Sequence, residues 1–410
     1  MKILLVNKFF YLRGGAERAF FDTAELLKSR GHKTIFFSMK HPNNRESSFS
    51  EHFVSPVDFN QMSGFWNKIK AAGRILYSIE SQKKIRKLLE QEKPKLVHLH
   101  NIHSQISPSI LYAIKKYNLP VIMTLHDYKL ICPVYTFLRE GKLCEKCTGQ
   151  NYYHCLTQKC SKDSYVKSLI NTLEMYFHHQ LLHIYNLVDI FICPSRFMQN
   201  KISQAGYKIK SHYLPNFIYP DKFVPSYTGE KETLVYFGRL SKEKGLFTLL
   251  KAVKNTDIKI KLIGDGPLKN DLKQKVKQEG LKNVILTGYQ SGKELYDHIK
   301  KSWAAVLPSL WYENNPRMIL ESFALGKPLI GSRIGGIPEL VIDEKTGFTF
   351  QPGSSEDLRN KILYLTRNPD KIHQMGKNAR LWAEQNFGPE THFKKLIHIY
   401  RTAQNNKSQI

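Results

Sequence analysis

Short apolar runs alternate with helix-like patterns along almost the whole chain. The runs are rich in Ile, Leu, Val and Phe without strict alternation, which is typical of parallel strands buried on both faces. In the first half we expect strands at 3–6, 34–38, 96–99, 121–125 and 189–193, and helices at about 15–30, 64–91, 107–117 and 195–205. In the second half we expect strands at 234–237, 259–263, 284–286, 304–307 and 329–331, and helices near 243–254, 267–279, 292–300, 316–325 and 356–366. This order predicts βαβ units with right-handed crossovers, and hence an α/β fold.

The alternation stops at residues 213–232, where three prolines stand in a stretch without periodicity. We interpret this stretch as a linker between two open sheets, because 410 residues are too many for one ordinary core. The predicted domains are 1–214, with a cysteine-rich insert at 130–162, and 215–388; residues 389–410 should form a helix and tail that pack back on the first domain. Since open α/β sheets bind ligands beyond the carboxyl ends of their strands, we expect a site where the two domains face each other.

Two turns carry candidate phosphate-binding groups. Gly14 and Gly15 stand between the first expected strand and helix, where bare backbone and a helix N-terminus can approach an anion. A simple tight turn is the alternative, because neither a complete dinucleotide fingerprint nor a P-loop follows. Arg239 and Lys244 frame the turn after another strand, and both could reach one diphosphate. Two solvated charges on a turn are the alternative there.

A third turn carries carboxylates. A loop bearing Glu313 follows an expected strand, and Pro316 stands where the next helix would begin. The start of that helix, from Asn315 through Pro316 to Ile319, can hold a phosphate. Glu313 would reach sugar hydroxyls from the loop. Glu321, about one and a half turns into the helix, would accept hydrogen bonds from two ribose hydroxyls.

These motifs in this order resemble the retaining glycosyltransferases of family 4. That family has the GT-B fold, in which two Rossmann-like domains with doubly wound parallel sheets face each other across a cleft. The resemblance covers nearly the whole chain. The residues that carry it are Gly14-Gly15, Thr124-Leu125-His126-Asp127, Leu214-Pro215-Asn216, Gly238-Arg239-Leu240 with Lys244-Gly245, Gly264-Asp265-Gly266-Pro267, Glu313 with Glu321, and Gly335-Gly336-Ile337-Pro338-Glu339-Leu340-Val341.

The resemblance implies a retaining, hexosyltransferase-type enzyme of cell-surface polysaccharide biosynthesis. The enzyme would move a sugar from a nucleotide diphosphate sugar to a glycan or lipid-diphosphate-linked acceptor, with the acceptor on the first domain and the donor on the second. A UDP-sugar is favoured over a GDP-sugar. Front-face attack, with the departing phosphate helping to take the acceptor's proton, requires no enzyme nucleophile. No catalytic metal is expected, because cations and a helix end supply the electrostatic stabilisation.

The resemblance also implies roles for individual residues. Arg239 and Lys244 would neutralise the diphosphate as it leaves. Glu313 would contact the donor sugar and Glu321 would hold the ribose. His126 would touch the sugar or the reacting centre.

Gly15 would lie against the donor phosphate or the acceptor. One stretch departs from the family's pattern, because many members have a Gly-rich stretch where this chain has Asn314, Asn315 and Arg317 around a proline. These side chains bear on which donor sugar fits, and not on the reaction type.

The predicted insert contains most of the six cysteines. Cys144 and Cys147 have the spacing of half a zinc site, and Cys155 and Cys160 could complete a four-thiolate tetrahedron. Such a zinc would be structural, because four thiolates leave no open position. Free thiols, disulfides and an iron–sulfur centre are the alternatives. The reserve ligands are Cys132 and His154.

The net charge of +27 predicts attraction to anions. Residues 65–77 mix aromatic and basic side chains, and a basic run follows at 83–87, which favours an amphipathic helix on an anionic membrane surface. A helix with one core face and one solvated face is the alternative. No run reaches the roughly 18–20 apolar residues of a membrane span, and the start lacks a cleavage site. We therefore expect a cytoplasmic protein that is peripheral on the inner face of the membrane.

Two other function classes stay open at this point. A basic nucleic-acid-binding protein with a zinc module would explain the charge and the cysteines, but not Glu313 and Glu321. No basic stretch is regularly interleaved with base-stacking aromatics, so we expect no nucleic acid partner. A nucleotide-sugar epimerase or hydrolase of the same fold would bind the same donor, and product analysis without an acceptor would separate it.

Overall fold

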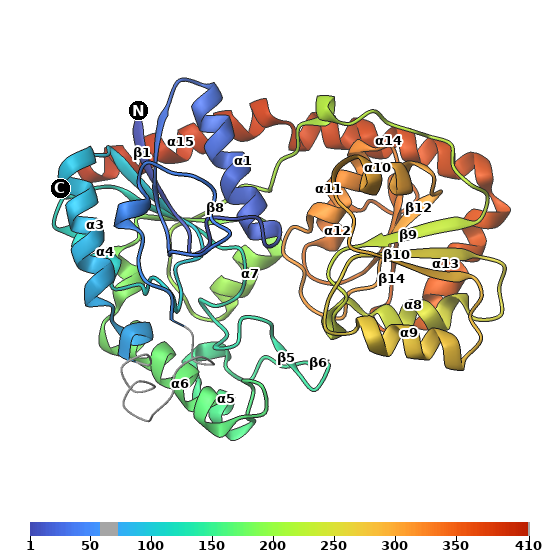
Figure 1. Ribbon diagram of the computed structural model, residues 1–410, viewed down its shortest axis with the longest axis horizontal. Coiled ribbons are helices and arrows are strands. Elements are labelled where there is room, and N and C mark those ends of the chain that lie inside the picture. The colour runs from blue at the N-terminus through green and yellow to red at the C-terminus, as the bar shows by residue number, and fades with distance from the viewer. Residues whose placement is uncertain (58–72, 409–410) are drawn as a thin grey trace. The chain divides into compact units, whose positions relative to one another are not determined.

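The computed structural model describes residues 1–57 and 73–408. The chain forms two compact units. The first comprises Met1–Phe137, Glu145–Leu214 and Phe393–Ile410, and the second comprises Leu138–Cys144 and Pro215–His392. The colours of Figure 1 show the consequence, because the red C-terminal segment belongs partly to each unit.

The first unit contains a parallel sheet, whose order within the described residues is β2-β1-β3-β4-β7-β8. Its central strands are fully buried, as expected where helices cover both faces of a sheet. The sequence predicts every strand except the last, which is short, half-buried and polar. The strands are β1 (Lys2–Val6), β2 (Lys33–Phe37), β3 (Leu96–Leu99), β4 (Val121–Thr124), β7 (Ile190–Cys193) and β8 (Ser211–Tyr213).

The helices of the first unit start at serine caps in several places. The hydroxyls of Ser78, Ser164 and Ser195 each accept a hydrogen bond from the amide three residues on, at 3.1–3.3 Å. Of the predicted helix 64–91, the part before residue 73 lies outside the described residues. The helices are α1 (Gly15–Ser29), α3 (Ile79–Glu92), α4 (Ile110–Lys115), α5 (Tyr153–Thr157), α6 (Tyr165–Tyr176) with a π-helical turn η3 (Phe177–Leu181), and α7 (Arg196–Gln204).

The C-terminal helix α15 (Pro389–Ser408) supplies part of the first unit's core. Leu396, Ile399 and Tyr400 are buried in one cluster with side chains of β1, β3, β4 and β7. The Tyr400 hydroxyl lies 2.7 Å from Nδ1 of His98 on β3. The helix therefore belongs to the scaffold that carries the strand ends of the first unit.

The second unit contains a second parallel sheet, of order β11-β10-β9-β12-β13-β14. The sequence predicts all of its strands except β14. The strands are β9 (Thr233–Phe237), β10 (Lys259–Ile263), β11 (Val284–Gly288), β12 (Ala304–Leu307), β13 (Leu329–Ser332) and β14 (Gly347–Phe350). Figure 1 shows α8 and α9 on one side of this sheet, with α10, α11 and α14 on the other.

One hydrophobic cluster joins the strands and helices of the second sheet. Most of its members are Ile, Leu, Val and Phe from strand interiors and from helix faces that repeat every three to four residues. The helices are α8 (Leu246–Val253), α9 (Lys269–Gln278), α10 (Gly292–Lys300), α11 (Arg317–Ala324), α12 (Ile337–Leu340), α13 (Ser355–Arg367) and α14 (Pro369–Phe387). Both units are thus doubly wound α/β sheets with helices on both faces.

Candidate functional site

Strand order in the second unit reverses between β9 and β12. From β9 the chain adds β10 and β11 on one side, and from β12 it adds β13 and β14 on the other. The loops that leave the carboxyl ends of β9 and β12 therefore flank the switch point, where such sheets bind ligands. These loops carry Arg239, Lys244 and Glu313, which the sequence predicts as functional residues.

Glycines let the loops of this switch point approach one another. Gly245 has φ +65°, and a Cβ there would lie 1.9 Å from the carbonyl oxygen of Pro308. Gly335 has φ +59°, and a Cβ there would lie 2.2 Å from the carbonyl oxygen of Glu313. The Gly336 amide donates to that same oxygen at 2.7 Å. The two glycines hold the backbone of the Glu313 loop against its neighbours, at a separation that no side chain permits.

Lys244 and Glu313 form an ion pair at the switch point, with Lys244 Nζ 2.6 Å from Glu313 Oε1. The Ser309 hydroxyl donates to the same Oε1 at 2.5 Å. Lys244 Nζ also lies 5.0 Å from the centroid of the Trp311 ring. Glu313 is only 4 % exposed, so the pair is largely shielded from water and its charges act at short range with little screening.

The other oxygen of Glu313, Oε2, has no hydrogen-bond partner among the residues that the structure describes. It can therefore accept a hydrogen bond from a ligand while Oε1 stays anchored. The side chain of Arg239 is exposed, and its backbone carbonyl accepts from the Tyr236 hydroxyl at 2.8 Å. An anchored carboxylate, a shielded lysine and an exposed guanidinium thus gather at neighbouring strand ends.

The start of α11 carries the predicted residues Asn315, Pro316 and Ile319, with Glu321 further along the helix. Asn315 is buried and binds the backbone and side chain of Asn216, at 3.2 and 3.0 Å. Ile319 is fully buried in the core and its amide donates to the Pro316 carbonyl, so its side chain is not at the surface. Glu321 keeps 19 % of its side chain exposed and lies 3.7 Å from Arg317 Nε. Of this set, Glu321 and Pro316 are partly exposed, and Asn315 and Ile319 are buried.

The first unit has its switch point between β1 and β3. Gly14 and Gly15 follow β1 and open α1. A Cβ added to Gly15 would meet nothing within 4 Å, so the backbone at the helix start is open to a ligand. Burial raises the pKa of Glu17 in the first turn of α1, and nearby Lys8 opposes that rise. Burial likewise lowers the pKa of Lys8 itself.

His126 follows β4 and pairs with His100, which follows β3. Nδ1 of His100 lies 2.7 Å from Nε2 of His126, and the two rings stack with centroids 5.0 Å apart. Burial lowers the pKa of His126 to about 4 and that of His100 well below its usual value. Both imidazoles are therefore neutral at pH 7. Because the hydrogen bond with His100 uses Nε2 of His126, Nδ1 is the ring nitrogen that faces away from His100.

Sequence reasoning missed His100 and Ser309 as site residues. His100 stands directly after β3 as His126 stands shortly after β4, and the carboxyl ends of parallel neighbours lie side by side. That register was the signal available for His100. Ser309 offered none, because its contact with Glu313 depends on the turn of a loop.

The structure does not support the predicted zinc site. Within the described residues no three or more His, Cys, Asp or Glu side chains are grouped so that they could hold a metal ion. Cys144 ends the hairpin of β5 (Leu138–Arg139) and β6 (Lys142–Leu143), which is grouped with the second unit. Cys147 and Cys155 pack instead in an apolar cluster of the first unit, against which Cys160 lies.

The cysteines are free thiols, and one is strongly disposed to stay protonated. A hydrogen bond with Cys160 and then burial raise the pKa of the Cys155 thiol far above its usual range. Cys147 and Cys155 thus contribute to the apolar packing of this part of the first unit.

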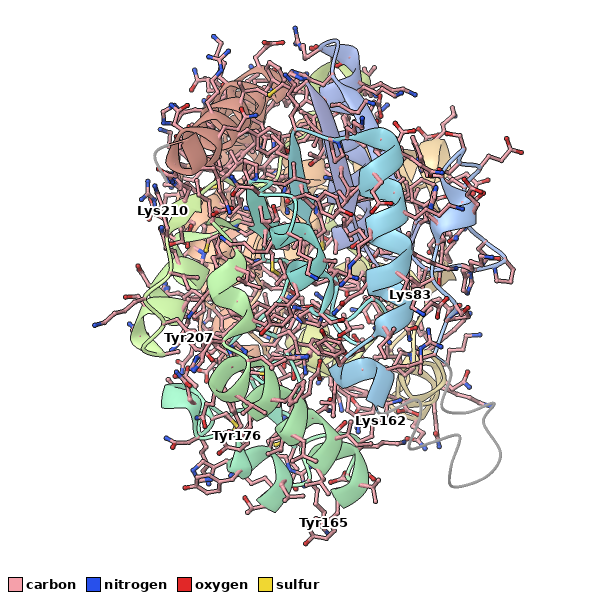
Figure 2. All side chains as sticks on the ribbon, turned by 90° about the vertical axis from the view of Figure 1, so that its left-hand side faces the viewer. Lys83, Lys162, Tyr165, Tyr176, Tyr207 and Lys210 are labelled. Atoms are coloured by element: carbon pink, nitrogen blue, oxygen red, sulfur yellow. The ribbon has the colours of Figure 1, made fainter. Side chains whose placement is uncertain are left out.

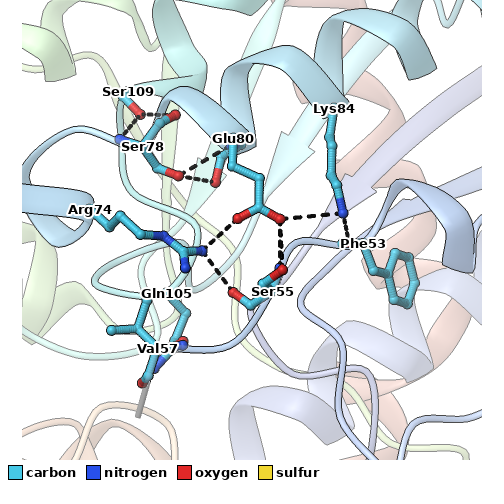
Figure 3. A network of polar contacts seen from close by, with 10 residues as sticks. Phe53, Ser55, Val57, Arg74, Ser78, Glu80, Lys84, Gln105 and Ser109 are labelled. Carbon is cyan, nitrogen blue, oxygen red and sulfur yellow. Dashed lines mark hydrogen bonds and ion pairs between the residues drawn. The ribbon is translucent and has the colours of Figure 1, made fainter. Parts of the chain in front are cut away.

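The predicted membrane-binding segment is only partly described, because residues 65–72 lie outside the described residues. In the part that is described, Glu80 forms ion pairs with two of the basic side chains (Figure 3). Arg74 Nη2 lies 2.7 Å from one of its oxygens and Lys84 Nζ lies 3.3 Å from the other. Ile85 and the leucines of α3 face the core. The described residues contain no helix long and apolar enough to cross a membrane.

Two family models match consecutive parts of the chain. The model described as Glycosyltransferase Family 4 matches residues 13–222, and the model described as Glycosyl transferases group 1 matches residues 220–382. The first match alone covers half of the chain. Together the two matches cover residues 13–382, which include every strand of both described sheets except β1, and all the candidate site residues described above.

Individual proteins are similar at lower identity. An uncharacterized glycosyltransferase of Methanocaldococcus jannaschii is 28 % identical over 197 residues, which are 48 % of this chain and 55 % of that protein. An uncharacterized 42.6 kDa protein in the cps region of Klebsiella pneumoniae is 27 % identical over 83 % of this chain and 87 % of its own length. The chain thus aligns with about half of one relative and with most of the other.

Among solved structures, Anabaena HepE in complex with UDP-glucose has a TM-score of 0.67 at 18 % identity. The match covers 98 % of this chain and 100 % of that one. At this identity the likeness shows the fold alone, and it confirms the predicted GT-B class of two Rossmann-like parallel-sheet domains.

Proposed function

Because the chain belongs to glycosyltransferase family 4 and is a glycosyltransferase, we propose that it transfers a sugar from a UDP-linked donor to a glycan acceptor. The acceptor is lipid-linked, the transfer retains the anomeric configuration, and the product is a polysaccharide precursor made at the membrane's inner face. The relative from the cps region of Klebsiella pneumoniae and the UDP-glucose complex of Anabaena HepE support the pathway and the donor.

The observation that carries the proposal is the ion pair of Lys244 and Glu313 beside the exposed Arg239, at the switch point of the second sheet. A diphosphate is an anion that needs two cations, and a sugar needs a hydrogen-bond acceptor with a fixed direction. Arg239 and Lys244 supply the cations. Glu313 supplies the acceptor through Oε2, since Lys244 and Ser309 hold Oε1.

Residues of α11 bind the ribose and the phosphates of the donor. Glu321 accepts hydrogen bonds from the two ribose hydroxyls through the part of its side chain that is exposed. The backbone amides at the start of α11, beside Asn315, donate to the phosphates, while Pro316, which has no amide hydrogen, opens the helix. Asn315 holds this segment to Asn216, so its side chain acts by positioning the helix start.

The chemical step needs no enzyme nucleophile. The acceptor's hydroxyl oxygen bonds to the anomeric carbon from the face that the phosphate leaves. The bond from that carbon to the phosphate oxygen breaks, its electron pair stays on the diphosphate, and the acceptor's proton passes to a phosphate oxygen. Arg239 and Lys244 stabilise the negative charge that grows on the leaving group, and we propose that no catalytic metal takes part.

The first unit supplies neutral donors and open backbone. His126, with a pKa of about 4 through burial, is uncharged at pH 7 and hydrogen-bonds the sugar or the reacting centre. Gly14 and Gly15 let a donor phosphate or the acceptor approach the start of α1. A neutral imidazole suits this place, because it leaves the positive charge to the groups that meet the phosphates.

Product analysis with a panel of UDP- and GDP-sugars tests this proposal. Wild type, Lys244→Met and the exposed-lysine control Lys251→Met are incubated with each donor, with EDTA, and with lipid-linked oligosaccharides as acceptors. We expect an α-linked product from an α-linked UDP-sugar, lost about a hundredfold or more in Lys244→Met and kept in the control. A product with inverted anomeric configuration would overturn the retaining mechanism. Equal activity of Lys244→Met and wild type would overturn the role of Lys244. Free sugar without transfer would indicate a hydrolase.

A further inference from the structure

Helix α6, which follows the cysteine-rich insert, turns four of its apolar side chains outward. Tyr165, Val166, Leu169 and Leu173 are 58, 67, 42 and 48 % exposed, and they repeat at three- to four-residue intervals along one side of the helix. We call these four residues the outward face of α6. In Figure 2 Tyr165 lies at the end of the helix and points away from the protein. Single exposed apolar residues are ordinary, but a continuous strip on one helix marks an interaction surface.

The buried side of α6 carries Met175, which packs in an apolar cluster, together with polar residues whose bonds fix the helix in this orientation. Ser168 is fully buried and its hydroxyl accepts from a backbone amide at 3.0 Å. Thr172 donates to a backbone carbonyl at 3.3 Å. Glu174 is 1 % exposed and pairs with Lys129 at 2.8 Å. Rotating α6 to bury its apolar side would break these bonds and leave a buried charge without its partner.

Basic residues border the outward face. Lys159 Nζ lies 4.4 Å from the centroid of the Tyr165 ring, and Lys162 and Lys167 are exposed. Asp163 is the one acidic residue in the sequence from 159 to 173, so three lysines and one aspartate leave this stretch at 3 − 1 = +2. The surface therefore presents apolar side chains with cations around them.

We propose that the outward face of α6 docks on an anionic phospholipid bilayer, with its apolar side chains at the acyl boundary and its lysines among the headgroup phosphates. Apolar residues rimmed by lysines are what an interfacial helix presents to lipid. A second copy of the chain is a poorer occupant, because a twofold contact through α6 would set these lysines against one another. The proposal shares the membrane location with the proposed function but is independent of the donor.

Vesicle sedimentation of the full-length protein tests this docking. The vesicles are phosphatidylcholine alone, or phosphatidylcholine with about one-third phosphatidylglycerol, at low salt. The test variant is Val166→Glu/Leu173→Glu. The control is Val224→Glu/Leu381→Glu, which places the same charges at apolar positions of the second unit that are 70 and 52 % exposed.

Each basic residue near an anionic surface strengthens binding about fivefold, and the variant sets two carboxylates among the lysines. We therefore expect at least tenfold weaker binding to the anionic vesicles for the test variant and less than threefold for the control. Circular dichroism verifies that both fold, and UDP binding is measured on the same samples. Normal UDP binding with lost vesicle binding separates this proposal from the donor site.

Three results would overturn the docking surface. If wild type does not bind anionic vesicles at low salt, an anionic bilayer is not the partner. Equal losses in the test and control variants show a general charge effect. A wild-type dimer that the test variant dissociates identifies a second copy as the occupant.

Discussion

Lys129 and Glu174 form a buried ion pair that joins α6 to the segment after β4 of the first sheet. Lys129 lies shortly after β4 and Glu174 lies on α6, and their side chains are 7 and 1 % exposed. Lys129 Nζ is 2.8 Å from the carboxylate and also donates to the Pro133 carbonyl at 2.8 Å. The substitution Lys129→Met keeps much of the side-chain volume and removes the charge. It leaves the Glu174 carboxylate buried without its cation.

The expected cost follows from the burial of the pair. Removing one partner of a buried ion pair destabilises a protein by about 3–5 kcal/mol, because the other charge stays desolvated. The second oxygen of Glu174 has no hydrogen-bond partner in the described part of the chain, so the native pair is not fully satisfied. We therefore expect about 3 kcal/mol, at the lower end of that range. Lys129→Met/Glu174→Leu removes both charges and should cost only about 1 kcal/mol relative to wild type.

The assay must resolve the first unit, because a chain of two units need not unfold in one step. Hydrogen exchange of peptides from α6 reports local opening, and urea denaturation followed by circular dichroism reports unfolding of the unit. A loss below about 1 kcal/mol in Lys129→Met, or a double variant no more stable than the single one, would refute the reasoning.

Three further predictions concern a tight turn, a histidine pair and an acidic network. Gly245→Ala should destabilise the second unit by at least about 2 kcal/mol in urea denaturation, because its φ is +65° and its Cβ would clash with backbone, whereas Gly15→Ala should cost little. His100→Ala should lower kcat about tenfold and shift the acid limb of the pH–rate profile to higher pH, because water that reaches His126 returns its pKa from about 4 towards 6.5. An acid limb at the wild-type pH would contradict this. Burial raises the pKa of Glu80, but hydrogen bonds and nearby cations outweigh it and hold the pKa below its usual value. Glu80→Gln should therefore lower thermal stability by at most about 1 kcal/mol at neutral pH, and the difference should vanish once the pH falls through the lowered pKa of folded Glu80 and wild type protonates.

The sequence predicted the fold well where strands are buried on both faces. β3, β4 and β7 consist mostly of apolar residues, and the sequence alone identifies them. β8 was missed because Ser, His and Tyr form a half-buried strand at the sheet edge. β14 was missed because its four residues, Gly-Phe-Thr-Phe, resemble a loop until β13 pairs with them. The residues of β8 and β14 alone do not indicate that these segments pair with a distant strand.

The candidate site was predictable in its charges but not in its contacts. Motif order identified Lys244 and Glu313, and the structure brings them within 2.6 Å of each other. The hydroxyl of Ser309 reaches Glu313 through the turn of a local loop, and the ring of His100 reaches His126 through the pairing of β3 with β4. The spacing of residues in the sequence encodes neither contact. For the same reason the cysteine spacing predicted a metal where the structure has apolar packing and free thiols. The outward apolar face of α6 follows from a contact of Glu174 with a residue 45 positions earlier.

The most direct test of the central claim is calorimetric titration of UDP and GDP into wild type, Glu321→Ala and the exposed control Glu294→Ala, without divalent metal. The account predicts that UDP binds to wild type and to the control more tightly than GDP, and that Glu321→Ala loses at least about tenfold in affinity, because a carboxylate with two ribose hydrogen bonds is worth 1.4 kcal/mol or more. No binding of either nucleotide to wild type, or equal binding by Glu321→Ala, would contradict the assignment of Arg239, Lys244 and Glu321 to a nucleotide-sugar site.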